Sequence, residues 1–203
     1  MSKSREKVKI ERSIVRHYRL ANEMSELFDL ESSIDNVLAV SMYKLNQLMD
    51  SERSSIFLFE PFKQQITSFS SQDLEKKEIR IPKSSGVAGW VFEHRIPAIV
   101  NDTDGDSRFY SGVDDMTGFR TRNLICTPLI DNKDRCSGTL QSLNKKSGNF
   151  TTDDLELLDL TARLVTVAIS NSRRYDEIQT TNMARKKLIK KIVSNIGNLP
   201  NKL

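Results

Sequence analysis

Residues 109–123 have the sequence FYSGVDDMTGFRTRN and run directly into LICTPLI, residues 124–130. The first segment crowds two glycines, two adjacent carboxylates, two threonines and two arginines into a polar loop, and the second has the apolar composition of a buried strand. Such a loop before a buried strand is typical of a binding pocket, because the strand holds still while the loop supplies hydrogen bonds. A long surface loop without a binding role has the same composition, so both interpretations stay open at this point.

The length of 203 residues fits one domain with long flanking helices or two small domains, and the composition is that of a soluble globular protein. The longest apolar runs are too short to cross a membrane, and the polar N-terminus does not resemble a signal peptide. The two cysteines, Cys126 and Cys136, are too few for a disulfide framework. We therefore expect free thiols and a reducing, cytoplasmic location.

Positive charge is concentrated at the two ends of the chain. Residues 1–20 carry a net charge of +5 and residues 183–203 carry +6 within a total of +4, so the residues between them carry −7. A nucleic-acid-binding protein instead has its positive charge on the folded recognition face, so we expect no nucleic-acid partner. The basic ends could touch an acidic partner or a membrane surface, but solvated helix ends are the simpler expectation.

Hydrophobic spacing predicts helices at both ends of the chain. One is expected over residues 8–29, and a second after a cap at Ser32 or Ser33. A last helix begins near residue 153, where acidic residues suit the helix dipole. Beyond about residue 170 it has too few apolar residues for a core, which predicts a projecting helix, with a coiled coil between two chains as one possibility, and then a frayed tail.

Between the helices the apolar period changes to two, and a short buried helix is expected at residues 86–92. The order of elements predicts an α+β fold with one antiparallel sheet of about six strands and helices grouped mainly on one face. The domain organisation is then a connecting helix over 1–29, a globular domain over 30–170, and a projecting helix and tail over 171–203. The predicted strands are residues 54–60, 65–70, 77–81, 98–100, 124–130 and 136–143.

The sequence lacks the residue patterns that most enzyme mechanisms require. His17 and His94 are the only histidines, neither has a second ligand at metal spacing, and there is no HExxH, paired CxxC or Walker motif. The glycine-containing stretch 86–89 lacks the lysine of a phosphate-binding loop. Adjacent carboxylates at Asp114 and Asp115 could do acid–base chemistry, although neighbours on a loop usually point apart. The residues therefore favour a binding module over an enzyme, with no catalytic residue and no metal.

The order of elements and three segments, 54–60, 79–89 and 109–128, resemble a GAF domain. The resemblance covers roughly residues 25–170, and it is strongest to the cyclic-nucleotide-binding GAF domains of the cGMP-stimulated phosphodiesterase, followed by those of related phosphodiesterases and cyanobacterial adenylate cyclases. The third segment is the specific one, because its polar run leading into a cysteine-containing strand is hard to obtain by chance. The resemblance implies a regulatory domain without enzymatic activity.

The family also has a signature of Asn-Lys, then Phe, three residues, Asp and Glu. Here it is Asn144, Lys145, Phe150 and Asp154, with Leu155 in place of the glutamate. In the family the lysine and aspartate form a salt bridge that braces the loop over the nucleotide, so the resemblance implies the same pair here. Asp154 would also serve as a helix-capping acid, and the two roles are compatible.

The resemblance assigns a nucleotide pocket by position. The amides at the start of the short helix would face the cyclic phosphate, Phe69 would stack on or flank the purine, and hydroxyls would bind ribose and phosphate. The ten assigned residues are Ser55, Phe69, Ser70, Val87, Ala88, Tyr110, Asp114, Thr117, Thr121 and Gln141.

Two of these positions leave the choice of base open. Ser70 and Gln141 replace an aspartate and a glutamate of the cGMP-binding relative, and a carboxylate is the natural acceptor for the N–H groups of guanine. Losing such a charged hydrogen bond costs about 1.5–3 kcal/mol. Serine and glutamine both donate and accept, so they would tolerate adenine. We expect cGMP or cAMP, with a lean to cGMP because of the loop.

The leading hypothesis is a sensor that signals through its terminal helices to a second chain or to a fused or associated output domain. The alternative is a GAF dimerisation or scaffold domain whose pocket binds nothing. GAF proteins that reduce free methionine sulfoxide use more clustered cysteines than Cys126 and Cys136 provide. Bilin attachment is disfavoured because Thr127 follows Cys126 where a histidine is common.

Overall fold

The computed structural model describes residues 11, 15–16, 18–19, 22, 34–70 and 79–197. The described residues between 11 and 22 are helical, in keeping with the predicted first helix, whose remaining residues lie outside the described part. The start of the predicted strand at residue 77 and the predicted tail after residue 197 lie outside it as well. The chain divides into two compact units, residues 1–168 and 169–203.

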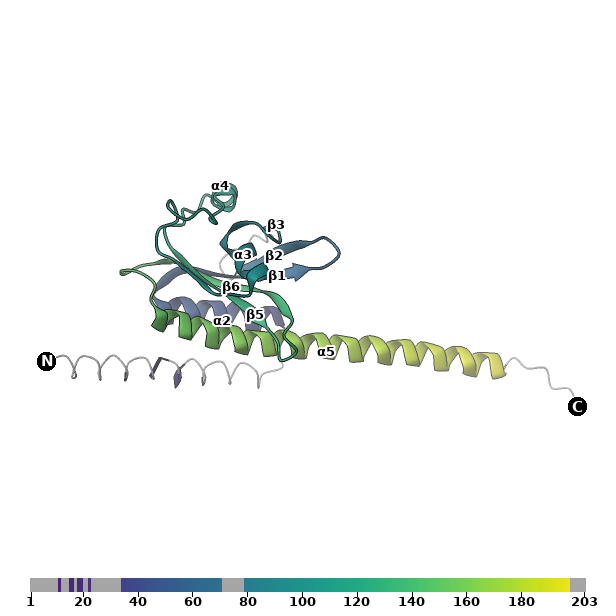
Figure 1. The fold of residues 1–203 in the computed structure, drawn as a ribbon. Helices are drawn as coiled ribbons and strands as arrows, with labels where there is room; N and C mark the ends of the chain where they lie inside the picture. The colour runs from purple at the N-terminus through teal and green to yellow at the C-terminus, as the bar shows by residue number, and fades with distance from the viewer. Residues whose placement is uncertain are drawn as a thin grey trace, which may run out of the picture. The chain divides into compact units, whose positions relative to one another are not determined.

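The first unit is built on a six-stranded antiparallel sheet in the order β3-β2-β1-β6-β5-β4 (Figure 1). The structure confirms the predicted fold class, and every predicted strand is present. The central strands β1 and β6 are each longer than predicted, because their polar ends continue the pairing. The strands are β1 Ser51–Glu60, β2 Gln65–Ser70, β3 Arg80–Pro82, β4 Ala98–Val100, β5 Leu124–Ile130 and β6 Cys136–Lys145.

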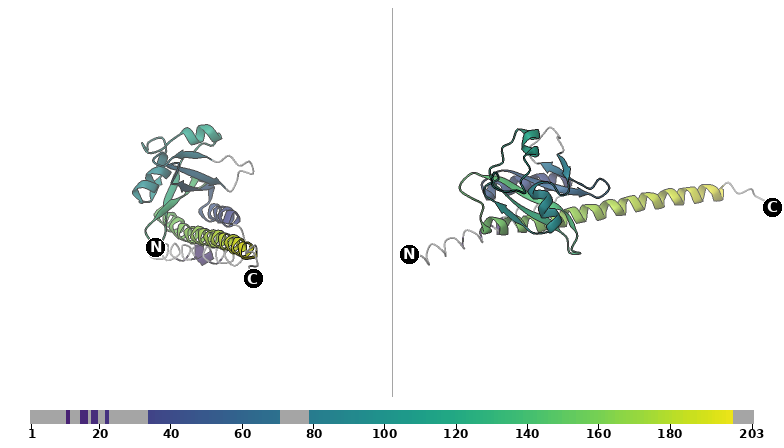
Figure 2. Two further views of the ribbon diagram at one scale, coloured as in Figure 1. Left: turned by 90° about the vertical axis from the view of Figure 1, so that its right-hand side faces the viewer. Right: turned by 45° about the horizontal axis from the view of Figure 1, so that its top comes forward.

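Helices cover both faces of this sheet (Figures 1 and 2). The two long helices, α2 and the first part of α5, lie on one face, as the expected grouping requires. Two short helices, α3 and α4, lie on the other face, which the sequence pattern did not place there. The helices are α2 Ile34–Met49, α3 Gly86–His94, α4 Gly112–Thr117 and α5 Thr152–Gly197.

Alternation along the central strands supplies a separate core to each face. Ile56 belongs to the face covered by α2, which contacts β1. Its neighbour Phe57 belongs to the cluster under α3, and both side chains are almost fully buried. Successive side chains of a strand point to opposite faces, so one strand contributes to two cores. Burying each such side chain contributes about 1.5–3 kcal/mol.

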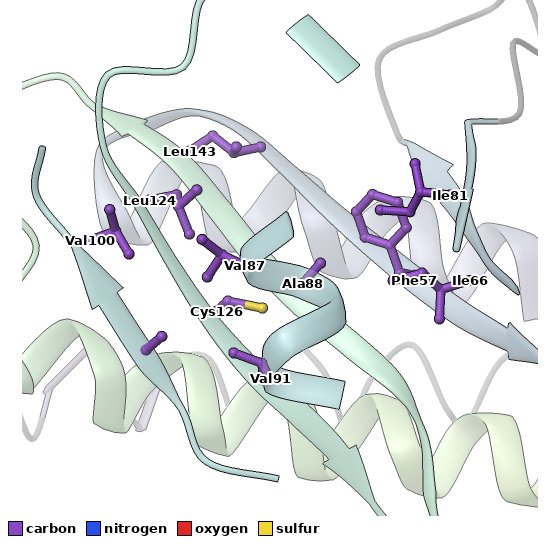
Figure 3. Packing of buried hydrophobic residues seen from close by; sticks show 11 residues of the cluster. Phe57, Ile66, Ile81, Val87, Ala88, Val91, Val100, Leu124, Cys126 and Leu143 are labelled. Atoms are coloured by element: carbon purple, nitrogen blue, oxygen red, sulfur yellow. The ribbon is translucent and has the colours of Figure 1, made fainter. Parts of the chain in front are cut away.

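The core under α3 fixes the position of that helix. Figure 3 shows Val87 and Val91 of α3 gathered over Leu124 and Cys126 of β5. Helix α3 can also approach the preceding turn closely, because a Cβ atom on Gly89 would lie 2.6 Å from the carbonyl carbon of Ser84. The predicted short buried helix is thereby confirmed, with its N-terminus held at one place on the sheet.

Helix α5 continues into the second unit, which begins close to the predicted end of the globular domain at residue 170. Large apolar side chains on this part of the helix are more than half exposed. None of the described helices has the length and apolar character needed to cross a membrane. The exposed side chains are Tyr175, Ile178, Met183, Leu188 and Ile189.

Candidate functional site

A small cavity lies on the α3 face of the sheet, where β1, β5 and β6 meet α3 and the segment that contains α4. Its volume is about 50 Å³. Six of the ten residues assigned to a nucleotide pocket line it: Val87, Ala88, Tyr110, Asp114, Thr121 and Gln141. Eight further residues line the cavity and are not among those assigned: Phe57, Ile81, Ser85, Gly86, Phe109, Val113, Leu124 and Leu143.

The N-terminus of α3 contributes backbone donors to this cavity. Ser85 is the N-cap residue, and its side chain makes no capping hydrogen bond. The first intrahelical bond is donated by Gly89 to the Ser85 carbonyl at 3.1 Å. The amides before it have no carbonyl within the helix, and the helix dipole adds positive potential there. Since the first turn contains no acidic residue, this end of the cavity suits an anion.

Helix α4 and the residues after it form the outer wall, which we call the lid and define as residues 109–123. The Asp114 carboxylate accepts hydrogen bonds from the Thr121 amide at 2.6 Å and the Thr121 hydroxyl at 2.7 Å. The turn between them is made by Gly118, whose φ of +69° is a left-handed conformation that glycine adopts without strain. Asp114 therefore holds the lid in a defined turn against the cavity.

Gln141 is the polar side chain on the floor of the cavity. It lies on β6, where its register partners are Ser55 of β1 and Cys126 of β5, and only 9% of the residue is exposed. Within the described part of the chain, no hydrogen bond joins its side chain to another protein group. A buried amide that faces an apolar cavity without a partner is suited to a polar group of a ligand.

Four of the assigned residues are not among those that line the cavity. Ser55 is buried on the same face of the sheet as Gln141. Ser70, at the end of β2, is the register partner of Ser55. Phe69 pairs with Ile56 and therefore belongs to the opposite face, which α2 covers, so its ring is not brought to the cavity. The Thr117 hydroxyl donates to the carbonyl of Val113, 2.9 Å away within α4.

The signature residues form a buried ion pair next to the lid. Lys145 Nζ lies 2.9 Å from Asp154 Oδ2, and the Asp154 side chain is 2% exposed. The same carboxylate accepts hydrogen bonds from the Thr151 amide at 2.9 Å and hydroxyl at 3.0 Å, so Asp154 also caps α5. Burial alone would raise the pKa of Asp154, but hydrogen bonds from Lys145, Thr151 and Arg16 outweigh it and lower the pKa.

Asn144 and Phe150 complete the signature. The Asn144 side chain accepts a hydrogen bond from the Arg122 amide at 2.7 Å and donates to the Arg120 carbonyl at 2.8 Å. It thereby fixes the end of the lid to β6. Phe150 is buried, and its ring centroid lies 5.5 Å from Lys145 Nζ, which places an apolar wall beside the ion pair.

A family model for the GAF domain matches residues 33–169. The chain belongs to the GAF domain family. This confirms the resemblance found in the sequence and identifies a regulatory or sensor domain. The match begins just before α2 and ends where the second compact unit starts.

A curated relative of this GAF protein is Dual 3',5'-cyclic-AMP and -GMP phosphodiesterase 11A of Takifugu rubripes, which is 28% identical over 173 residues. The match covers 76% of this chain and 19% of the relative, so the chain spans about a fifth of that protein. The likeness therefore concerns a GAF-containing portion of that protein.

Solved structures of low sequence identity share the fold. The GAF domain of a phosphoenolpyruvate-protein phosphotransferase from Coxiella burnetii superposes with a TM-score of 0.70 at 14% identity, over 80% of this chain and 98% of that one. A free methionine-R-sulfoxide reductase from Neisseria meningitidis gives 0.66 at 18% identity, over 78% and 91%. Because one of these proteins is an enzyme, the shared fold leaves open whether a GAF domain binds or catalyses.

Proposed function

We propose that this GAF domain is a cytoplasmic regulatory sensor that binds a cyclic nucleotide in the cavity beneath the lid. The proposal is carried by one observation: the first amides of α3 and the side-chain amide of Gln141, which have no hydrogen-bond partner among the described residues, line the same apolar cavity. The first group suits the cyclic phosphate and the second suits the edge of a base. No other cofactor is required by this arrangement.

The size of the cavity implies that the lid moves on binding. Pockets for small ligands usually measure about 300–1,000 Å³, so about 50 Å³ is too small for a nucleotide. The wall that can yield is the lid, because Tyr110 is 48% exposed and α4 contains no buried residue. Binding would therefore shift the lid outward and reorder it, which is the structural change that a sensor needs.

The ligand we propose is cGMP or cAMP. A glutamine amide has both a donor and an acceptor, and rotation of the amide lets it pair with either base. The resemblance of the lid to cGMP-binding GAF domains favours cGMP slightly. Signalling would pass through the terminal helices to a second copy or to a fused or associated output domain. The competing function is a dimerisation scaffold with a pocket that binds nothing.

Thiol chemistry is disfavoured by the position of Cys126. Burial raises its pKa to about 12, so the reactive thiolate is nearly absent at neutral pH. Cys136 is partly buried, and burial raises its pKa as well. These properties support binding over the reductase chemistry of the Neisseria meningitidis protein.

The direct test is calorimetric titration of the nucleotide-free chain with cGMP and then cAMP. We expect binding of at least one of them at low-micromolar or lower concentration. The absence of binding heat with both nucleotides, from protein shown to be folded, would favour the scaffold function instead.

A further inference from the structure

An ion pair joins the N-terminal helical segment to the globular domain. Arg16 Nη2 lies 3.2 Å from Asp154 Oδ1, although the two residues are 138 positions apart in the chain. The Asp154 side chain is 2% exposed and that of Arg16 is 31% exposed. The arginine thus reaches a buried carboxylate from a segment that precedes the part matched by the GAF model.

Arg16 and Lys145 bind different oxygens of the same carboxylate. Lys145 Nζ lies 2.9 Å from Asp154 Oδ2, so the three side chains form an ion triad. Lys145 Nζ also donates to the Met49 carbonyl at 3.2 Å, which fixes the ammonium between α2 and α5. Removing Arg16 would leave Asp154 with one cation in place of two and would free one of its oxygens.

The main chain next to Lys145 holds the end of the lid. The Lys145 amide donates to the Asn123 side chain at 2.8 Å, and the Asn144 amide donates to the Asn123 carbonyl at 2.9 Å. The Asn144 side chain binds the Arg122 amide and the Arg120 carbonyl. Arg120, Arg122 and Asn123 are therefore all hydrogen-bonded to Asn144 or Lys145.

Thr121 lies within this bonded segment and is the residue that binds Asp114 of α4. A continuous series of contacts thus leads from Arg16 through Asp154 and the end of β6 to the wall of the cavity. Each contact is an ion pair, a hydrogen bond or a peptide bond, which is the kind of physical connection through which two sites can be coupled.

We propose that Arg16 is a positioning residue of the lid, and that through it the N-terminal segment and the pocket influence each other. The nucleotide-dependent part of this inference rests on the proposed function. By linkage, a change that moves the N-terminal segment away from Asp154 alters ligand affinity, and ligand binding alters the hold on Arg16 by the same factor.

The first experiment uses the whole chain without nucleotide and measures hydrogen exchange of the lid amides. In Arg16→Met we expect faster exchange at Thr121 and Arg122, whose amides bind Asp114 and Asn144. The matched control is Arg19→Met, since Arg19 is exposed on the same helical segment. Arg16→Lys keeps the charge and should restore slow exchange in part, which a loss of packing alone would not predict.

Two exchange results would overturn the inference. One is exchange at Thr121 and Arg122 that equals the wild type in Arg16→Met. The other is an equal acceleration in the lid and in the β1–β2 ladder, because that pattern indicates general destabilisation.

A second arm measures nucleotide affinity of the same variants. Because the nucleotide must order the looser lid of Arg16→Met as it binds, we expect this variant to bind about 2- to 30-fold more weakly and Arg19→Met to bind like the wild type. Equal affinity in both variants contradicts the coupling. If the wild type binds no nucleotide, the proposed function fails, while the exchange measurement still decides whether Arg16 positions the lid.

Discussion

At the scale of single residues, each side chain of the proposed pocket has its own role, and the role of Asp114 is the best defined. Its carboxylate is occupied by Thr121, so in the closed lid it acts as a brace and not as a free ligand group. Charge-assisted hydrogen bonds contribute about 1.5–3 kcal/mol each when they are shielded from water, and less at a partly exposed residue such as Asp114.

The bonds from Asp114 keep the lid in one defined turn as it shifts outward, so Asp114→Ala leaves a disordered lid that the nucleotide must order when it binds. We therefore expect nucleotide binding to weaken several-fold and the unfolding free energy to fall by only about 1–2 kcal/mol. Calorimetry and thermal unfolding measure the two effects. Asp115→Ala is the control, because Asp115 is the exposed neighbour on the same helix. Unchanged affinity in Asp114→Ala would remove the lid brace from the binding proposal.

Gln141 carries the base-recognition part of the proposal. Gln141→Leu keeps the approximate volume but removes both hydrogen-bonding groups, which leaves the base edge unpaired at a cost of about 1–3 kcal/mol, or about 5- to 150-fold in affinity. Titration with cGMP and cAMP measures this loss. Gln47→Leu, an exposed substitution on α2, should change neither affinity, and equal behaviour of the two variants would contradict a base contact at Gln141.

The Asp154 ion triad predicts a dependence of stability on acid. The pKa of Asp154 in the folded chain lies below its ordinary value of 3.8, because its hydrogen bonds outweigh its burial. Protonation therefore favours the unfolded chain. The stabilising contribution is complete above about pH 5 and is lost as the pH falls through 3.8 and then through the lower folded-state pKa.

We expect Asp154→Asn to cost about 3 kcal/mol at neutral pH and to unfold with a weaker dependence on pH in that acidic window. Denaturant titrations of both proteins from pH 7 to pH 3 provide the measurement. Parallel pH profiles would show that other carboxylates control acid unfolding.

At the scale of elements, the start of α3 is the proposed anion site. A negative charge placed there should have opposite effects on nucleotide affinity and on the stability of the fold. Ser85→Asp adds a good N-cap and a negative charge at the positive end of the helix dipole, which should stabilise the helix by about 0.3–1 kcal/mol. The same charge should repel the cyclic phosphate and weaken binding about tenfold or more. In Ser85→Asp the unfolding temperature should therefore rise, while the nucleotide affinity measured by calorimetry should fall.

Ser84→Asp is the control for this substitution, since Ser84 is exposed and precedes the N-cap. A gain in stability without any loss of affinity in Ser85→Asp would place the phosphate elsewhere.

The elements also show what the sequence could and could not predict. Strands β2, β4 and β5 occur at the predicted residues, because their apolar alternation and flanking turns are unambiguous. Phe69 was assigned to the pocket by position in the chain, but its pairing with Ile56 puts it on the other face. A shift of one residue reverses the face of every side chain, and only the register decides it.

Phe57 is the opposite case, because it lines the cavity and is not among the ten residues that the resemblance assigns to the pocket. Residues 54–57 of β1 are all buried, and both faces of the strand carry apolar side chains. Periodicity cannot tell two buried faces apart. The Lys145–Asp154 pair, by contrast, was implied by the family signature, and the structure confirms it.

At the scale of the whole molecule, a binding domain becomes a sensor only when something reads its state, and the second unit offers a surface for that role. The exposed apolar side chains of α5 in this unit include Ile178 at 58% and Leu188 at 59%. Isolated helices with exposed apolar residues are stabilised by pairing with another helix. We propose that a second copy of the chain supplies this partner.

The expected result is a dimer in light scattering that Ile178→Gln combined with Leu188→Gln converts to a monomer. The two substitutions remove apolar area that is buried only in the dimer, at about 25 cal/mol per Å², so the affinity of the two chains for each other should fall by orders of magnitude. Thr180→Gln, exposed on the same helix, should leave the dimer intact. Nucleotide affinity should stay within about twofold of the wild type if the pocket is complete within one chain. A wild-type monomer would contradict pairing through α5 and leave a fused or associated output domain as the reader of the lid.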